Sequence, residues 1–173
     1  SVFYIAVKGY WPLMTIDFSS DDDSLPPKKR IGAILFACNI NAVRSAMAEA
    51  MVKVTYPGKI FVDSCGVSPG FPDGFAITVM KEIGIDMNTH QPKSFDDLDS
   101  NFYDVIISFS PEANDMAITL TKSVDCNTLY WPVDNLANLT GSRDERLRAY
   151  RRVRDDIQVK LENYLGKPIA GKT

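Results

Sequence analysis

The sequence is poor in cysteine and histidine, and this scarcity excludes two common ways of stabilising a small protein. Its 173 residues include three cysteines at irregular spacing, without a CxxC motif, and one histidine. Such a set is typical neither of a disulfide framework nor of a zinc site. We therefore expect reduced thiols, no metal, no cofactor and a cytoplasmic location.

The sequence also lacks an excess of charge of one sign, and it lacks a long hydrophobic run. Nineteen lysines and arginines stand against 22 aspartates and glutamates, so no basic face is expected for nucleic acid or an anionic membrane. The apolar stretch at the N-terminus is a few residues long and has no basic start, unlike a membrane span or a signal peptide. Neither nucleic acid nor a membrane is expected as a partner.

The length and the hydrophobic content of 45% suit one hydrophobic core. Residues 1–30 contain three consecutive aspartates, two prolines and several serines, a composition typical of a solvated linker. We expect residues 1–30 to be an N-terminal extension and linker, partly disordered, although residues 1–13 are also compatible with an added edge strand. Residues 31–167 are expected to form the folded domain, and residues 168–173 a C-terminal tail.

Short apolar runs alternate with helical patterns through this domain. The runs with the length and composition of buried parallel strands are residues 33–37, 59–63, 104–109 and 128–131. The helical patterns are residues 45–56, residues 72–83, a helix from about Pro111, and a last helix that begins after Ser142 with a capping-box spacing to Glu145. This alternation predicts an α/β fold, a doubly wound three-layer sandwich around a four-stranded parallel sheet, with the ligand site beyond the carboxyl ends of the strands.

The segment ILFACNINAVRSAMAEAM, residues 34–51, places a polar loop between the first strand and the first helix. Backbone N–H groups and the positive end of the helix meet there, which predicts an anion site. The same groups would favour the thiolate of Cys38, and the planar fork of Arg44 could bind two oxygens of a phosphate. Ser45 could donate a hydrogen bond to the sulfur. The usual nucleotide loops are excluded, because neither GxxxxGK[ST] nor GxGxxG is present.

This segment resembles the first strand, C-x5-R-S loop and first helix of the low-molecular-weight protein tyrosine phosphatases, a fold shared with thioredoxin-coupled arsenate reductases. The resemblance continues in the family's order through VDSCGVSPG (62–70), VMKEIGIDMNTHQPKSF (79–95), DVIISFSPEAND (104–115) and YWPVDN (130–135). It implies the phosphotyrosine phosphatase I-like fold and hydrolysis through a phosphocysteine intermediate. The implied substrates are phosphotyrosine proteins or small aryl phosphates, and the implied product is inorganic phosphate.

The resemblance also assigns roles to single residues. Cys38 matches the nucleophile, Arg44 the phosphate clamp and Ser45 the partner of the thiolate. Asn41 matches the asparagine that holds the shape of the loop, and Ser64 the serine bonded to it. The backbone expected to bind phosphate belongs to Asn39, Ile40, Asn41, Ala42, Val43, Arg44 and Ser45.

A general acid is expected in the late segment YWPVDNLANLTG, where Asp134 is the sole carboxylate. The family usually has Asp-Pro there, whereas Asn135 follows the aspartate in this chain. A structural interpretation, in which Asp134 only caps a turn, stays open.

An aromatic wall at the mouth of the pocket is the remaining feature expected of a phosphotyrosine site. Phe71 is the main candidate, and Tyr130 and Trp131 are weaker ones. A role of Phe71 as a core or loop anchor is equally compatible with the sequence. The single histidine, His90, is predicted to be a loop or surface residue rather than a catalytic base.

Two departures from the family pattern, Ile40 where the family commonly has glycine and the missing Asp-Pro dipeptide, leave a non-catalytic module open. The stretch SFSPEANDMAITL has Ser110 and no cysteine where the arsenate reductases need relay thiols, so reduction by that relay is not expected. Cys65 and Cys126 are predicted to be small buried residues near strand ends, although Cys126 could resolve an adduct on Cys38. The alternatives are therefore an arsenate reductase and a non-catalytic phosphate-binding or phosphoprotein-binding module.

Overall fold

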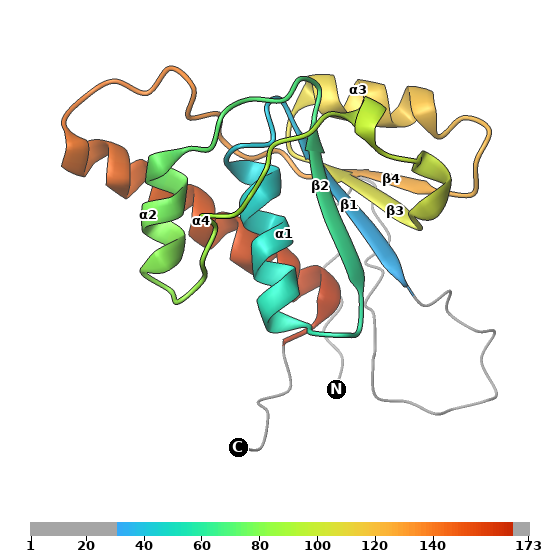
Figure 1. Ribbon diagram of the computed structural model, residues 1–173, viewed down its shortest axis with the longest axis horizontal. Coiled ribbons are helices and arrows are strands. Elements are labelled where there is room, and N and C mark those ends of the chain that lie inside the picture. Colours follow the sequence, from blue (N-terminus) through green and yellow to red (C-terminus); the bar gives the residue numbers. More distant parts are fainter. Residues whose placement is uncertain (1–30, 168–173) are drawn as a thin grey trace, which may run out of the picture.

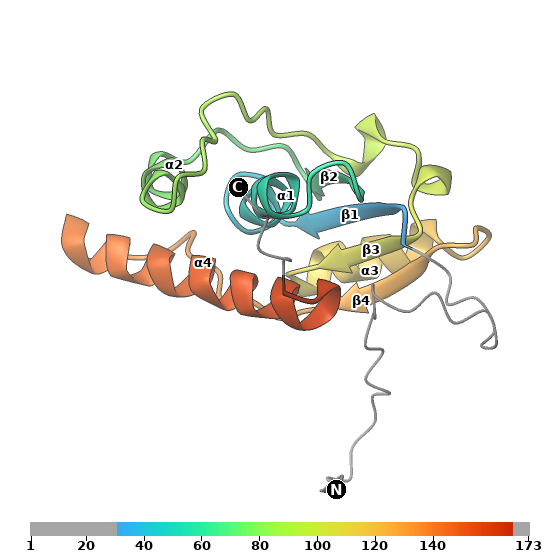
Figure 2. The ribbon, with the colours of Figure 1, turned by 90° about the horizontal axis from the view of Figure 1, so that it is seen from below.

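The computed structural model describes residues 31–167, which form a four-stranded parallel sheet with helices on both faces (Figures 1 and 2). The elements are β1 (Ala33–Cys38), α1 (Arg44–Thr55), β2 (Phe61–Gly66), α2 (Gly74–Lys81), the short 3-10 helices η1 (Phe95–Asp97) and η2 (Ser100–Phe102), β3 (Val105–Ser108), α3 (Pro111–Leu120), β4 (Asn127–Tyr130) and α4 (Arg143–Leu165). The predictions for residues 1–30 and 168–173 lie outside the described residues and stay predictions.

Strand β1 lies inside the sheet, whose strand order is β2-β1-β3-β4. All six of its residues are buried, because both faces of the sheet are covered. Ile34, Phe36 and Cys38 belong to the core under α1 and α4, whereas Leu35 and Ala37 belong to the core under α3. Helix α4 runs across α1 and α2 on the first of these faces (Figure 1). The predicted three-layer α/β sandwich is confirmed.

The second strand was predicted two residues too early. Residues 57–60 form a turn in which Gly58 has a φ of 70°, and the ladder begins only when the amide of Phe61 donates to the carbonyl of Gly32. At its other end β2 continues through Asp63 and Ser64, two polar residues that do not look like a buried strand in the sequence. Strand β4 also differs from prediction, because it is an edge strand and is only partly buried.

The helix ends follow the capping residues of the sequence. Ser142 and Glu145 form the predicted capping box at the start of α4. Helix α2 begins at Gly74 rather than at Pro72, because the Asp73 carboxylate accepts hydrogen bonds from the first-turn amides. None of the described helices is both long enough and apolar enough to cross a membrane.

Candidate active site

The loop of residues 38–45, called the cysteine loop below, joins β1 to α1 at the carboxyl end of the sheet. The segment after β2 runs beside it and fixes its backbone. The amides of Val67, Ser68 and Gly70 donate to the carbonyls of the first three loop residues over 3.0, 3.0 and 2.8 Å. The carbonyls of Cys38, Asn39 and Ile40 are therefore held by hydrogen bonds from the segment after β2.

The left-handed backbone position of the cysteine loop is Asn41, whose φ is 54°. It is the non-glycine residue with a positive φ among the residues described, and asparagine tolerates this conformation better than most residues. Ile40 does not adopt a positive φ. The replacement of the family's glycine by Ile40 therefore causes no backbone strain of this kind.

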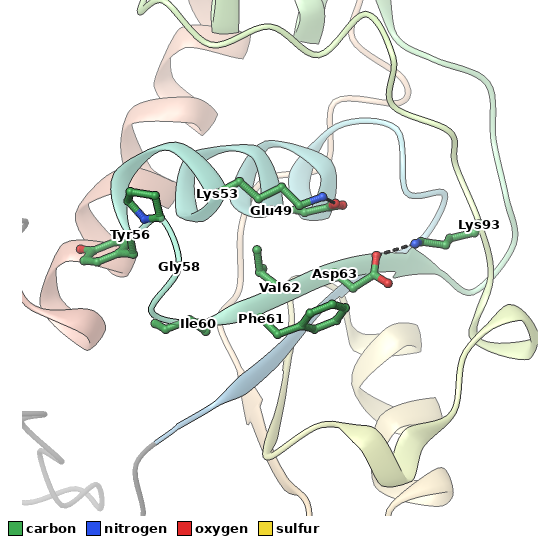
Figure 3. A pocket seen from close by; sticks show the side chains of 10 residues that line it. Glu49, Lys53, Tyr56, Gly58, Ile60, Phe61, Val62, Asp63 and Lys93 are labelled. Atoms are coloured by element: carbon green, nitrogen blue, oxygen red, sulfur yellow. Dashed lines mark hydrogen bonds and ion pairs between the residues drawn. The ribbon is translucent and has the colours of Figure 1, made fainter.

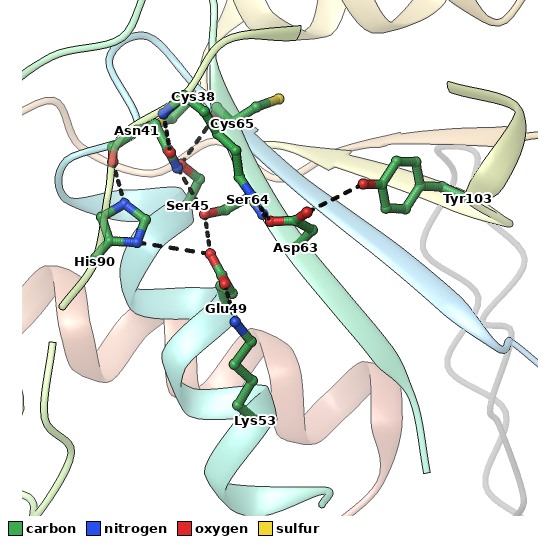
Figure 4. A network of polar contacts seen from close by, with 11 residues as sticks. Cys38, Asn41, Ser45, Glu49, Lys53, Asp63, Ser64, Cys65, His90 and Tyr103 are labelled. Carbon is green, nitrogen blue, oxygen red and sulfur yellow. Dashed lines mark hydrogen bonds and ion pairs between the residues drawn. The ribbon is translucent and has the colours of Figure 1, made fainter. Parts of the chain in front are cut away.

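Cys38 lies at the end of β1 with 1% of its surface exposed, and its sulfur contacts Ser45 (Figure 4). The distance from Cys38 Sγ to Ser45 Oγ is 3.0 Å. Asn41 Nδ2 donates both to Ser45 Oγ, over 3.0 Å, and to Ser64 Oγ, over 2.7 Å. These four side chains, each predicted from the sequence, form one buried hydrogen-bonded group. Its geometry can hold a hydroxyl at the sulfur and the asparagine in its left-handed conformation.

Two further side chains support this group, and sequence reasoning did not identify them. Ser64 Oγ donates to the carboxylate of Glu49, which also accepts from Lys53 and lies 3.9 Å from the ring of His90 (Figure 4). The other ring nitrogen of His90, Nε2, is 2.7 Å from the carbonyl oxygen of Asn41. Because a carbonyl can only accept, this nitrogen carries a proton. His90 is in a loop, as predicted, but it is tied to the cysteine loop.

Glu49 could have been found from helical spacing. Ser45, Glu49 and Lys53 follow each other at intervals of four residues in α1, so they share one face of the helix. Only 7% of the surface of Glu49 is exposed, and a buried carboxylate needs hydrogen-bond donors or cations as partners. No comparable local signal points to His90, which reaches the loop from 49 residues away.

Arg44 is buried and its guanidinium is held by three acceptors. Nη1 donates to the carbonyls of Phe109 and Val133 over 3.0 and 3.1 Å, and Nη2 donates to Asn39 Oδ1 over 2.6 Å. The first two acceptors follow β3 and β4, so the carboxyl ends of three strands fix the cation. The bond to Asn39 ties the guanidinium to the cysteine loop, where an anion would be bound.

Asp134 follows Val133, whose carbonyl binds Arg44, and its side chain is exposed. The backbone at this position therefore lies close to the guanidinium. The next residue, Asn135, accepts a hydrogen bond from the amide of Ala137 over 3.1 Å, and this bond closes a turn at the position where the family that the sequence resembles usually has proline. The role of Asp134 as general acid stays a prediction.

The three aromatic candidates for a substrate wall differ in their surroundings. Phe71 is 90% exposed and follows Gly70, whose amide is bonded to the cysteine loop. Tyr130 is 38% exposed at the end of β4. The ring of Trp131 packs against Phe109 and against Tyr164 of α4, with centroid distances of 6.3 and 5.3 Å. Trp131 is therefore partly buried at the edge of the core, and its role as a wall residue, like those of Phe71 and Tyr130, stays a prediction.

The other two cysteines lie away from the sulfur of Cys38. Cys65 pairs with Ala37 in the register of the sheet and faces the core under α3, on the opposite face from Cys38. Burial, and then the charge of Cys38, raise the pKa of the Cys65 thiol well above its usual range. Cys126 precedes β4 at the other end of the sheet, about 16 Å from Cys38 along the strand direction at 3.3 Å per residue.

A separate cavity of about 330 Å³ lies beside the free edge of β2, between this strand and α1 (Figure 3). Its lining includes Lys93, whose ammonium is 2.5 Å from the carboxylate of Asp63. Glu49 also lines the cavity, so this one carboxylate belongs both to the cavity and to the support of the cysteine loop. The candidate anion site at the loop is not part of this cavity.

The chain is similar in sequence to arsenate reductases. An arsenate reductase of Staphylococcus epidermidis is 32% identical over 134 residues, which are 76% of this chain and 93% of that protein. A glutaredoxin arsenate reductase of Synechocystis is 27% identical over 136 residues, which are 78% of this chain and 96% of that protein.

The similar solved structures include both tyrosine phosphatases and arsenate reductases. A tyrosine phosphatase of Erwinia amylovora superposes with a TM-score of 0.66 at 18% identity, over 78% of this chain and 91% of that one, which shows the fold alone. An arsenate reductase in its phosphate-binding state superposes with a TM-score of 0.60 at 28% identity, over 77% and 95% of the two chains. Residues 33–172 match the family described as low molecular weight phosphotyrosine protein phosphatase, and the chain belongs to that family.

Proposed function

We propose that the protein hydrolyses phosphomonoesters, with phosphotyrosine or another aryl phosphate as substrate and a phosphocysteine intermediate on Cys38. The observation that carries this proposal is the arrangement of a thiol, a hydroxyl and a guanidinium on one anion-binding loop. Cys38 Sγ lies 3.0 Å from Ser45 Oγ, and Arg44 is fixed beside the loop by Asn39, Phe109 and Val133. These groups support the nucleophile and the phosphate clamp of the first displacement, and Asp134 is the general acid that we propose for it.

In the first displacement the Cys38 thiolate attacks phosphorus and the bond to the ester oxygen breaks. The loop amides and Arg44 stabilise the charge on the transferring group, and Asp134 gives its proton to the leaving oxygen. In the second displacement water attacks the phosphocysteine, Asp134 takes a proton from that water, and inorganic phosphate leaves. Ser45 Oγ, which lies 3.0 Å from the sulfur and 3.2 Å from the carbonyl oxygen of Cys65, turns its proton to the sulfur as the sulfur becomes a thiolate again.

A second candidate, arsenate reduction, is favoured by the names of the similar sequences, which are arsenate reductases. In this reaction the Cys38 thiolate attacks arsenate, one arsenate oxygen leaves as water, and a second thiol then attacks the sulfur of the resulting sulfur–arsenic adduct. Arsenic leaves as arsenite with two electrons, and the two sulfurs are joined in a disulfide. The positions of Cys65 and Cys126 disfavour an internal second thiol, so this reaction would need an external one, such as glutathione.

One set of assays separates these functions. Hydrolysis of p-nitrophenyl phosphate by the wild type, lost in Cys38→Ser, is expected from a phosphatase. If the protein instead forms arsenite only with glutathione and glutaredoxin, and hydrolyses the aryl phosphate negligibly, it is an arsenate reductase and our proposal is wrong. Arsenite formation with thioredoxin that is lost in Cys126→Ser would revive the internal relay. Binding of phosphate without either reaction would identify a non-catalytic module.

A further inference from the structure

Glu112, in the first turn of α3, reaches the cysteine loop from the outside. Its Oε2 accepts a hydrogen bond from Asn39 Nδ2 over 3.0 Å, and Asn39 Oδ1 accepts from Arg44 Nη2 over 2.6 Å. Two consecutive hydrogen bonds through the Asn39 carboxamide therefore connect the Glu112 carboxylate to the Arg44 guanidinium. The amide group of Asn39 has its oxygen and its nitrogen fixed by these two partners, so its orientation is determined.

The carboxylate is ionised under ordinary conditions. The backbone amide of Glu112 itself, then the hydrogen bond from Asn39, and more weakly the charge of Arg44 lower the pKa of the Glu112 carboxyl. The N-terminal position in α3 also suits a negative side chain, because the helix dipole is positive there. Glu112 is exposed, in contrast to the buried Glu49 behind the loop. The site thus has one carboxylate beneath it and another at its outer rim.

A negative charge at the rim changes which anions the loop prefers. A bound phosphate dianion and the Glu112 carboxylate repel each other across the Asn39 carboxamide, and this lowers the affinity for any free oxyanion. A substrate that carries a cationic group near its phosphate gains an attraction that compensates this cost. A phosphomonoester flanked by lysine or arginine fits this description, whereas inorganic phosphate and arsenate do not.

We propose that Glu112 is a specificity-determining residue of this site, which selects phosphomonoesters with a positive charge beside the phosphate and disfavours free tetrahedral oxyanions. The preference for substrates rests on the proposed phosphatase function, but the effect on free oxyanions does not. Weak retention of inorganic phosphate would also limit inhibition by the product.

The first test measures binding without catalysis. Inorganic phosphate is titrated by calorimetry into Cys38→Ser, into Cys38→Ser with Glu112→Gln, and into Cys38→Ser with Asp115→Asn. Glutamine keeps an acceptor for Asn39 and removes only the charge. Asp115 is the matched control, because it is an exposed carboxylate of the same helix. We expect Glu112→Gln to bind phosphate about three- to tenfold more tightly and Asp115→Asn to change the affinity by less than about twofold.

The second test measures selectivity. Two phosphotyrosine peptides that differ only in having lysines or glutamates beside the phosphotyrosine are compared by kcat/KM. The wild type is expected to prefer the lysine peptide, and Glu112→Gln should reduce that ratio by at least about threefold, whereas Asp115→Asn should leave it unchanged. The difference should shrink at 1 M salt, where the Debye length is about 3 Å.

The outcomes are distinct. Unchanged phosphate affinity in Glu112→Gln, or a selectivity ratio that does not fall, overturns the proposal and leaves Glu112 as a stabiliser of the α3 terminus. An equal effect of Asp115→Asn overturns it as well, because the effect would then reflect net charge alone. If the wild type hydrolyses no aryl phosphate, the proposed function fails, and phosphate binding alone decides the role of Glu112.

Discussion

Replacing Gly66 by alanine should displace the cysteine loop, because β2 passes the loop at a distance that leaves no room for a side chain. A Cβ on Gly66 would lie 2.7 Å from the carbonyl oxygen of Ser68, 2.8 Å from the amide nitrogen of Asn41 and 2.8 Å from the carbonyl carbon of Ile40. All three are backbone atoms, so no side chain can rotate away to relieve the contact.

The expected magnitude follows from these distances. The loop or the strand must move by several tenths of an ångström, and overpacking of this kind costs about 1–3 kcal/mol of unfolding free energy. For a domain of this size, each kcal/mol lowers Tm by about 3–5 °C. Because the displaced backbone belongs to Ile40 and Asn41, the loop amides would lose alignment with the phosphate, and kcat/KM should fall by about ten- to a hundredfold.

The assay is hydrolysis of p-nitrophenyl phosphate together with thermal unfolding, with and without inorganic phosphate. Gly74→Ala is the matched control, since a Cβ on Gly74 meets nothing within 4 Å and no positive φ is involved. This control should keep its activity and its Tm, or gain slightly in stability. A Gly66→Ala protein with unchanged kcat/KM and unchanged stabilisation by phosphate would refute the argument that this close approach sets the loop.

The remaining predictions concern the groups of the site and one buried thiol. Arg44→Lys should keep the charge but lose the planar fork, and we expect kcat for p-nitrophenyl phosphate to fall by about a hundredfold or more; near-normal turnover would contradict the clamp. Asp134→Asn should slow phenyl phosphate much more than p-nitrophenyl phosphate, because only the poorer leaving group needs the proton; equal effects on both would place the acid elsewhere. Burial raises the pKa of Cys65 in the folded state, so above about pH 8.5 the unfolded chain loses a proton that the folded chain keeps, and stability falls by up to about 1.4 kcal/mol per pH unit. Denaturant unfolding between pH 8 and 9.5 should therefore show a flatter pH dependence in Cys65→Ala, and an identical slope would disprove this assignment.

The central strand and the cysteine loop could be predicted from the sequence because their signals are local. A continuous apolar run predicts a strand that is covered on both faces, and the spacing of Cys38, Arg44 and Ser45 predicts an anion loop with a nucleophile. The capping box at Ser142 is similarly local. Each of these predictions depends on residues within one turn or one strand, and the structure confirms where these elements lie.

The partners of Arg44 could not be predicted, because two of them are backbone carbonyls. The carbonyls of Phe109 and Val133 are available whatever side chains stand at those positions, so the sequence carries no mark of them. They reach the guanidinium because β3 and β4 end at the same edge of the sheet as β1. His90 was missed for a related reason, since its ring binds a carbonyl of the loop across 49 residues.

The polar residues that made β2 difficult to predict also hold the cysteine loop in place. Polar residues made the strand look shorter than it is, yet Ser64 is fully buried at the point where β2 passes behind the loop. Its hydroxyl accepts from Asn41 and donates to Glu49, and both bonds replace the water that the buried groups have lost. A hydrophobic residue there would have strengthened the strand pattern and left the side-chain amide of Asn41 short of an acceptor. The apolar pattern of β2 is therefore interrupted at Ser64, the residue that binds Asn41 of the cysteine loop.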